Sequence, residues 1–304
     1  MKRRVLGVIA LLLSMSMLVV GCSSGSKGST KEAEKEQSTG DKTGTITVAY
    51  KVAPPNLDSD QSTEWTVTAV MNHVYEGLYE FNASNEAVPH LAKSCDIEDD
   101  GKTYVFHLRE GVLFHDGTEM KAEDVKASFD RWFSVNEMGI SVSEYLNSVD
   151  VIDDYTVSVK LNSVYAPFLN VIASPTSNQK MVVRPASLIE KYGNNVLEEH
   201  IGTGPYKFDS WVPDASVKLV KFDDYVPVEE EASGLAGKRV AYANEIDIQF
   251  VTDESVRVSG VETGEFMFAG VWYVATVVAV GGNVMQQRCQ CAFLRYWMQM
   301  WKEC

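Results

Sequence analysis

The sequence contains few cysteines and no concentrated positive charge. Five of its 304 residues are cysteine, and three of these, Cys289, Cys291 and Cys304, lie close to the end of the chain. So few cysteines cannot form a disulfide framework. Acidic residues outnumber basic ones by 42 to 27, and Lys and Arg cluster only within the first four positions. The chain therefore lacks the basic stripe that binds a phosphate backbone, and we expect no nucleic acid partner.

Motifs of catalysis and of nucleotide binding are missing as well. G-x-S-x-G, H-E-x-x-H and G-x-x-x-x-G-K-[ST] do not occur. Gly202-x-Gly204 alone does not form a nucleotide loop, and Pro205 removes an N–H that would face a phosphate. We therefore predict that the protein is not an enzyme and has no cofactor; an extracytoplasmic hydrolase and a purely structural lipoprotein are the alternatives from other classes.

Metal ligands do not occur at the spacing of a metal site. His107 and His115 are eight residues apart, with His73 and His90 upstream, which is not the short-gap spacing of a zinc site. Acidic pairs such as Asp99-Asp100 are interpreted as turns or solvated faces, with calcium ligation as the sharper alternative. We predict no metal site.

The N-terminus has the pattern of a secretory signal. Three basic residues precede an apolar run from Val5 to Val20, which is shorter than the roughly 20 residues that span a bilayer as a helix. Cleavage is thus favoured over an uncleaved anchor. The end of the run, Val19-Val20-Gly21-Cys22, resembles the lipobox of bacterial lipoproteins. On that resemblance residues 1–21 are a signal peptide and Cys22 carries the lipid; an ordinary signal peptide is the alternative.

Residues 22–44 have the composition of a linker. After Cys22 the only apolar side chain is Ala33, and the others are mainly Ser, Gly, Thr, Lys and Glu. Such a segment cannot bury enough surface to offset its chain entropy. We predict a lipidated flexible linker that holds a folded body at the outer face of the cell membrane, with the body starting near Thr45.

The body mixes the periods of strands and helices, which predicts an α+β or mixed α/β fold. Strands are expected at 45–50, 206–211 and 216–222, and hairpins at 95–109, about Asp100-Gly101, and at 149–161, about Asp153-Asp154. Helices are expected at 64–79, 121–136 and 185–192.

Five separated segments of this body resemble one family. They are Asn56-Leu57-Asp58, Tyr75-Glu76-Gly77-Leu78, Leu91–Val125, the run IGTGPYKF at Ile201–Phe208 and the region of Lys218–Tyr225. In type and order they resemble the extracellular solute-binding proteins of family 5, the peptide- and nickel-type receptors of bacterial ABC importers. The resemblance covers about Ile46 to Ala269. Cys95 departs from it, because the family usually carries Trp there, and we expect a buried thiol beside a void that costs about 3 kcal/mol.

The resemblance implies a two-lobed periplasmic-binding-protein-like receptor of type II whose hinge closes around a peptide and then meets the permease subunits. Nickel chelates or other small solutes are alternative ligands. The residues present would form the first lobe and its inserted subdomain, and we expect a monomer. Pro54, Pro55, Asn56, Thr203 and Gly204 are the candidate ligand contacts, because such loops expose backbone groups. Asp58 and Glu76 are interpreted as structural.

The composition changes after Ala269. Residues 270–304 contain one acidic residue, Glu303, together with three of the six tryptophans. We expect a frameshift or aberrant join there, which leaves a partial solute-binding domain at 45–269, an aberrant tail at 270–304, no second lobe and weak ligand capture. A membrane-inserting segment at Phe266–Val280 and a genuine short variant are the alternatives.

Overall fold

A five-stranded mixed sheet carries the N-terminal strand of the body. The computed structural model describes residues 44–176 and 179–270. The strand order is β11-β1-β10-β9-β8, and β1 (Thr45–Tyr50) pairs in parallel with β10 (Glu245–Phe250) and β11 (Phe268–Gly270). β9 (Ser216–Lys221) and β8 (Tyr206–Val212) extend the sheet in antiparallel fashion. The predicted strands at 45–50, 206–211 and 216–222 are thus confirmed, whereas β10 and β11 were not predicted.

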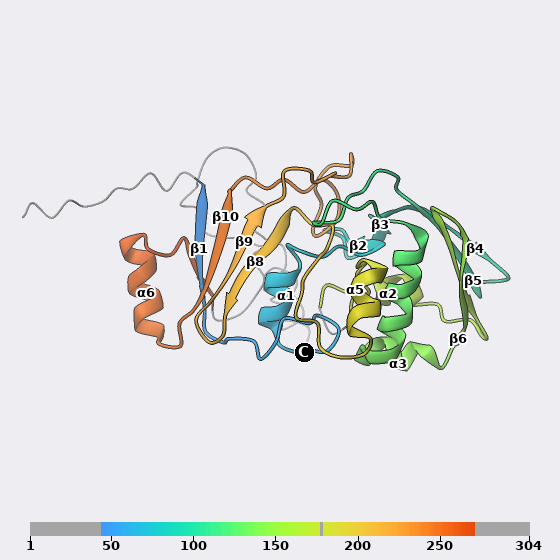
Figure 1. Ribbon diagram of the computed structural model, residues 1–304, viewed down its shortest axis with the longest axis horizontal. Coiled ribbons are helices and arrows are strands. Elements are labelled where there is room, and N and C mark those ends of the chain that lie inside the picture. The colour runs from blue at the N-terminus through green and yellow to red at the C-terminus, as the bar shows by residue number, and fades with distance from the viewer. Residues whose placement is uncertain (1–43, 177–178, 271–304) are drawn as a thin grey trace, which may run out of the picture. The chain divides into compact units, whose positions relative to one another are not determined.

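Helices cover both faces of this sheet. α1 (Trp65–Met71) packs Val67 and Val70 into one core cluster with Val48 and Ile246 of the sheet. α6 (Glu254–Thr263) follows β10 and lies on the opposite face from α1 (Figure 1). Because each helix leaves a parallel strand toward a different face, the loops after β1 and β10 diverge at this end of the sheet.

The predicted helix at 64–79 is wrong in its second half. α1 ends at Met71, and the next residues pair with a distant segment, since Gly204 N donates to Val74 O at 3.0 Å and Tyr206 N donates to His73 O at 3.2 Å. These two carbonyls bond to a distant segment instead of continuing the helix. The apolar spacing was read correctly, but its last member, Leu78, belongs to the other core cluster.

The second sheet belongs to the segment between β1 and β8. Its strand order is β4-β5-β7-β6, all antiparallel, with β4 (Ala92–Glu98), β5 (Thr103–Leu108), β6 (Leu146–Asp153) and β7 (Thr156–Leu161). The elements around it are the short hairpin β2 (Tyr79–Phe81) and β3 (Ala87–Pro89), and the helices α2 (Ala122–Val135), α3 (Glu137–Ser143), α4 (Phe168–Ile172) and α5 (Ala186–Tyr192). Both predicted hairpins and the helices near 121–136 and 185–192 are confirmed.

Turn chemistry explains why the first hairpin was predictable. Gly101 has φ +91°, and Asp99 and Asp100 before it also have positive φ. Asp tolerates this region better than most residues, and Gly adopts it freely. The short helix α3 was missed, although Asn136 caps it by accepting from the amides of Met138 and Gly139.

Cys95 does not occupy the buried position expected for it. It is half-buried on the edge strand β4, packs against the core cluster that contains Leu78 and Phe106, and places its Sγ 3.7 Å from Asp96 O. An edge strand lets solvent reach this side chain, so the expected buried void is a wrong prediction. Burial of the half-covered sulfur raises the pKa of the thiol to about 12, which makes it a poor nucleophile.

The core cluster that contains Leu78 and Phe106 should be strongly destabilised by the loss of the Phe106 side chain. This side chain is fully buried, contacts Phe129 at a centroid distance of 6.1 Å and lies on the inner face of β5. We expect Phe106→Ala to lower the free energy of unfolding by about 3–5 kcal/mol, measured by urea denaturation. The adjacent Val105→Ala changes the opposite, half-covered face and should cost about 1 kcal/mol or less; equal losses would contradict this assignment of faces.

Candidate ligand-binding region at the carboxyl ends of parallel strands

The carboxyl ends of β1 and β10 form the most favourable place for a ligand. In open α/β sheets ligands bind outside the carboxyl ends of the strands, at the point where successive connections leave toward opposite faces. β1 and β10 meet this condition through α1 and α6, and Val251 N donates to Tyr50 O at 2.8 Å between the two ends. The exposed residues there include Lys51, Val52 and Thr252.

Aromatic side chains gather at this end of β1. Tyr50 is buried, with its ring 4.9 Å from Trp65 in an edge-on contact and 6.4 Å from Phe268. Burial raises the pKa of Tyr50 to about 12, so its hydroxyl stays protonated. Trp65 is half-buried and thus keeps part of its surface for other contacts. Sequence reasoning missed Trp65 and Thr252; the aromatic at the start of a helix after a Pro-rich loop was the available signal for Trp65.

The Pro-rich loop lies directly after β1, as its sequence position requires. Pro54 is buried, Pro55 is exposed and Asn56 is half-buried. Asn56 Oδ1 accepts from Asp58 N at 3.0 Å, and Val52 O accepts from Thr66 Oγ1 at 3.0 Å. These bonds fix the loop from both sides while Pro55 faces solvent.

Thr203 and Gly204 lie elsewhere and are buried. Thr203 is 1% exposed, and its hydroxyl donates to Glu76 Oε2 at 2.9 Å. Gly204 packs against the backbone of residues 73 and 74, where an added Cβ would lie 2.5 Å from His73 O. The structure therefore does not bring these two residues together with Pro54, Pro55 and Asn56 at one exposed surface.

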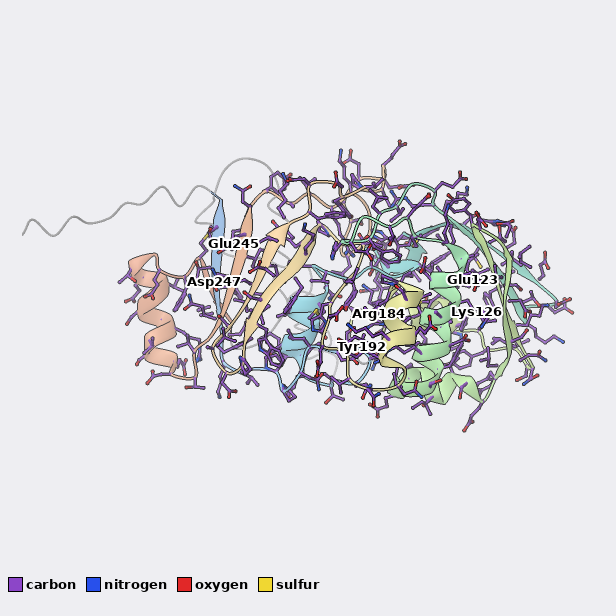
Figure 2. The ribbon with its side chains drawn as sticks, viewed as in Figure 1. Glu123, Lys126, Arg184, Tyr192, Glu245 and Asp247 are labelled. Carbon is purple, nitrogen blue, oxygen red and sulfur yellow. The ribbon has the colours of Figure 1, made fainter. Side chains whose placement is uncertain are left out.

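A buried ionic cluster supports the Pro-rich loop from behind. It consists of Asp58, Asp60, Arg131 and Arg184, which we call the Asp58 cluster. Arg131 donates to Asp58 at 2.6 Å and to Asp60 at 3.2 Å, and Arg184 donates to Asp60 at 2.8 Å. Arg184 lies just before α5 (Figure 2). All four side chains are 1% exposed or less, so the cluster joins three distant segments of the chain with no net charge.

A second buried cluster surrounds Glu76. The members of this Glu76 cluster are Glu76, Glu80, His90, Lys180, Thr203, Tyr225 and Arg239. Glu76 accepts from His90 at 2.9 Å and from Tyr225 at 2.7 Å, and Glu80 pairs with Lys180 at 2.6 Å. Arg239 lies 3.6 Å from Glu76 and 3.3 Å from Glu80.

The electrostatics of Glu76 follow from these partners. Burial alone would raise the pKa of its carboxyl, but His90, Arg239 and Tyr225 favour the ionised form and lower the pKa to about 2. Asp58 and Glu76 are thus buried and fully engaged, in agreement with their interpretation as structural residues.

The histidines named as possible metal ligands do not converge. His90 bonds to Glu76, His107 Nε2 lies 2.9 Å from Asp96, and His115 bonds to the backbone of residues 202 and 204. Among residues 44–176 and 179–270 no three His, Cys, Asp or Glu side chains are arranged to hold a metal ion.

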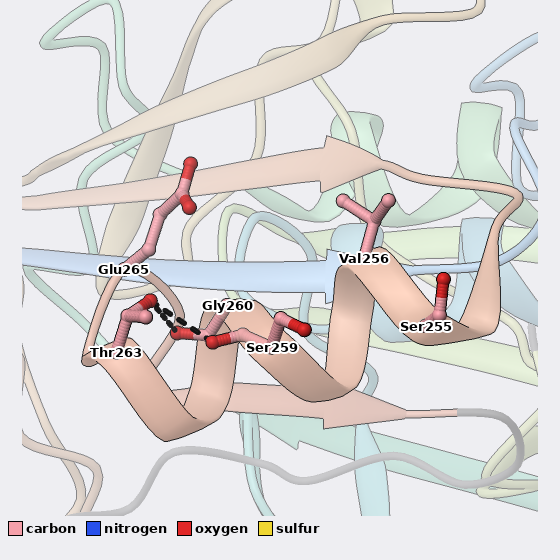
Figure 3. Close-up of a pocket in the computed structure, with 6 residues that line it drawn as sticks. All are labelled: Ser255, Val256, Ser259, Gly260, Thr263 and Glu265. Atoms are coloured by element: carbon pink, nitrogen blue, oxygen red, sulfur yellow. Dashed lines mark hydrogen bonds between the residues drawn. The ribbon is translucent and has the colours of Figure 1, made fainter.

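A shallow depression of about 260 Å³ runs along α6 (Figure 3). It is lined by Ser255, Val256, Ser259, Gly260, Thr263 and Glu265. The hydroxyl of Thr263 already donates to the carbonyls of Ser259 and Gly260. Because these six residues include no buried charged side chain, we assign this depression no ligand.

The sheets and helices described above have the mixed α/β fold of the type II periplasmic binding proteins. The sequence model of the family described as bacterial extracellular solute-binding proteins, family 5 Middle, matches residues 86–280. The chain belongs to this family. The match reaches beyond Ala269, the predicted end of the resemblance. Proteins of this family are typically solute receptors of ABC importers and not enzymes.

Curated relatives and solved structures give the same classification. The chain is 32% identical over 216 residues to the glutathione-binding protein GsiB of Escherichia coli, which covers 70% of this chain and 39% of the relative. The Helicobacter pylori protein DppA, solved with the peptide STSA, is 27% identical with a TM-score of 0.63 and covers 75% and 47%. NikZ of Campylobacter jejuni, solved with Ni(L-His), is 26% identical with a TM-score of 0.61 and covers 73% and 42%. The chain thus spans less than half the length of these relatives.

Several predictions from the sequence fall outside the described residues. Residues 1–43 include the predicted signal peptide, Cys22 and all of the linker except Gly44, and residues 271–304 include all of the predicted aberrant tail except Gly270. Within the described part of the chain no helix has the length and apolarity needed to cross a membrane.

Removing one member of the Asp58 cluster should lower the free energy of unfolding. Arg184→Met leaves Asp60 buried with one partner fewer, and we expect a loss of about 3–5 kcal/mol in the free energy of unfolding. The matched control is Lys191→Met, because Lys191 pairs with Glu199 on the surface and should contribute about 1 kcal/mol or less. Denaturant titration of both variants measures the difference, and similar small effects would show that the cluster is not cooperative.

Proposed function

We propose that this chain captures short peptides outside the cell membrane for delivery to the permease subunits of an ABC importer. Membership in family 5 supports the receptor role, and the carboxyl ends of β1 and β10 supply the surface that carries the proposal. Glutathione is a tripeptide, and DppA was solved with a tetrapeptide, so two of the relatives named above are described with peptide ligands.

The ligand would lie extended against the loop after β1. Pro54, Pro55 and Asn56 are the proposed contacts there, with Trp65 as the aromatic neighbour and Lys51 as the exposed cation. Backbone hydrogen bonding of the strand-addition type suits a receptor that accepts varied side chains. Thr203 and Gly204, which are buried beside Glu76 and the backbone of residues 73 and 74, take a supporting role in this proposal.

A nickel chelate is the second candidate ligand. The similarity to NikZ, solved with Ni(L-His), is the observation that favours it. Such a ligand would bring its own metal-binding groups, so it needs no cluster of protein ligands.

Calorimetric titration of the full-length protein separates these ligands. We expect saturable binding of glutathione or of the peptide STSA, and weaker binding of an STSA analogue with N-methylated amides, because N-methylation removes backbone donors. Binding of Ni(L-His) alone would overturn the peptide assignment.

The aromatic contact provides a site-specific test. Trp65→Ala should weaken peptide binding at least about tenfold, since aromatic anchors commonly contribute more than about 1.4 kcal/mol at binding sites. Trp65→Phe should retain most of the affinity, and Tyr145→Phe, at a half-buried aromatic just before β6 in the second sheet's segment, should leave it unchanged. If Trp65→Ala binds like the parent protein with an intact fold, the ligand lies elsewhere.

We further propose that Cys22 carries the lipid that anchors the protein. The apolar run, the lipobox-like residues and the polar linker support this assignment. Cells given labelled palmitate should incorporate it into the protein, and Cys22→Ser should abolish the incorporation. Cys95→Ser is the matched control and should remain labelled; label retained by Cys22→Ser would refute the anchor.

A further inference from the structure

Residues 202–205 form a buried connection that leads from the segment of the second sheet into β8, and we call this connection the crossing. All four are buried, and the segment lies against residues 73 and 74 at the end of α1. A Cβ at Gly202 would lie 2.1 Å from Val74 O, so only glycine permits this approach. Backbone contacts therefore fix the position of the crossing, and the groups that bond to its backbone determine where β8 starts.

The ring of His115 bonds to both glycines of this crossing. His115 Nε2 lies 2.9 Å from Gly204 O, and Gly202 N donates to His115 Nδ1 at 3.2 Å. The amide of His115 also donates to Gly202 O at 2.9 Å, and its ring lies edge-on to Phe222 at 5.0 Å.

These partners determine the protonation of the ring. A carbonyl can only accept and an amide N–H can only donate, so Nε2 must carry the hydrogen and Nδ1 must keep its lone pair. A doubly protonated ring would lose the bond from Gly202.

We propose that His115 is a positioning residue which holds the Gly202–Gly204 crossing in place only as the neutral Nε2–H imidazole, so that a second proton on the ring loosens the joint between the end of α1 and β8. This inference goes beyond the proposed function and does not depend on the identity of the ligand.

The surroundings favour the neutral ring. Burial lowers the pKa of His115 to about 4, although the bond to Gly204 O and the carboxylates of Glu76 and Asp116 act in the opposite direction; Lys207, on β8, lowers the pKa further. Of these charged groups, Glu76 follows α1 in the sequence, Asp116 lies next to His115 in its turn, and Lys207 is on β8. The unfolded ring titrates near 6.5.

The sign of the pH dependence follows from these two values. Between about pH 6.5 and 4 the unfolded chain binds a proton at His115 and the folded chain does not. The stabilising contribution of His115 to the free energy of unfolding is therefore fully present above pH 6.5 and is lost as the pH falls toward 4. The folding equilibrium constant should drop by up to about tenfold per pH unit for this one group.

Two readouts test the proposal. In the wild-type protein, ¹⁵N NMR of the imidazole at pH 7 should show a protonated Nε2 and an unprotonated Nδ1; the opposite tautomer or a charged ring would overturn it whatever the variants do. Hydrogen exchange should show protection of the Gly202 amide that falls at least about tenfold in His115→Phe, which keeps a ring beside Phe222 but no ring nitrogen.

Two further variants separate positioning from general stability. His115→Gln offers one donor and one acceptor without titrating, so it should restore much of the protection of the Gly202 amide. Between pH 4 and 6.5 the free energy of unfolding of this variant should depend on pH with a slope that is smaller by the uptake of one proton. His73→Phe is the control: burial also lowers the pKa of His73 to about 4, and its ring packs edge-on against Tyr206 at 5.9 Å. It should lose a similar pH dependence while leaving Gly202 protected. If the free energy of unfolding depends on pH with the same slope in the wild type and in His115→Gln, the proposal is refuted.

Discussion

Buried ion pairs between distant segments hold the described part of this chain together. Asp58, Asp60, Glu76 and Glu80 flank α1 within a short stretch of sequence, and the cations that pair with them come from positions 131, 180, 184 and 239. Removing charges from water costs several kcal/mol for each ion, so such clusters stabilise a fold only when every member is present. The two clusters therefore require the second sheet's segment, the crossing at 202–205 and the long connection before β10 to assemble as one cooperative unit.

This requirement explains the geometry of the candidate ligand region. The Asp58 cluster fixes the chain immediately after the Pro-rich loop, through the bonds of Asp58 to Arg131 and to the amide of Leu197. The Glu76 cluster and His115 fix Thr203 and its flanking glycines, which lie apart from that loop. Loops that are anchored so firmly from within can present backbone groups to a ligand at low entropic cost. The exposed part of the region is correspondingly small, with Lys51, Pro55 and Thr252 at the surface.

Local patterns in the sequence were sufficient for the elements whose periodicity and turns agree. The first hairpin, α2 and the strand β1 were predicted within a few residues, because alternation, an Asp-Gly turn and an apolar stripe each point to one structure. The second half of the helix predicted at 64–79 failed because the carbonyls of His73 and Val74 bond to residues 206 and 204, a contact that no local pattern encodes. The parallel strands β10 and β11 were missed for the same reason, and the partners of Glu76 lie up to 163 residues away in sequence. Asp58 and Glu76 were interpreted as structural residues, but the sequence could not identify which cations pair with them.

The same clusters restrict how a charged ligand can be recognised. Structures with a similar fold at 25–27% identity were solved with agropinic acid, with peptides and with a nickel–histidine complex, so the fold alone does not select the ligand. In the described part of this chain Arg131, Lys180, Arg184 and Arg239 are buried against carboxylates, and Arg257 donates to the carbonyls of Val251 and Thr252. None of the first four can meet a ligand carboxylate without leaving a buried carboxylate short of a partner, which costs about 1–3 kcal/mol or more. Arg257 would have to give up its bonds to two backbone carbonyls. A carboxylate bound at the carboxyl ends of β1 and β10 must therefore rely on exposed groups such as Lys51, while backbone pairing, which needs no charge, remains available to a peptide of any sequence.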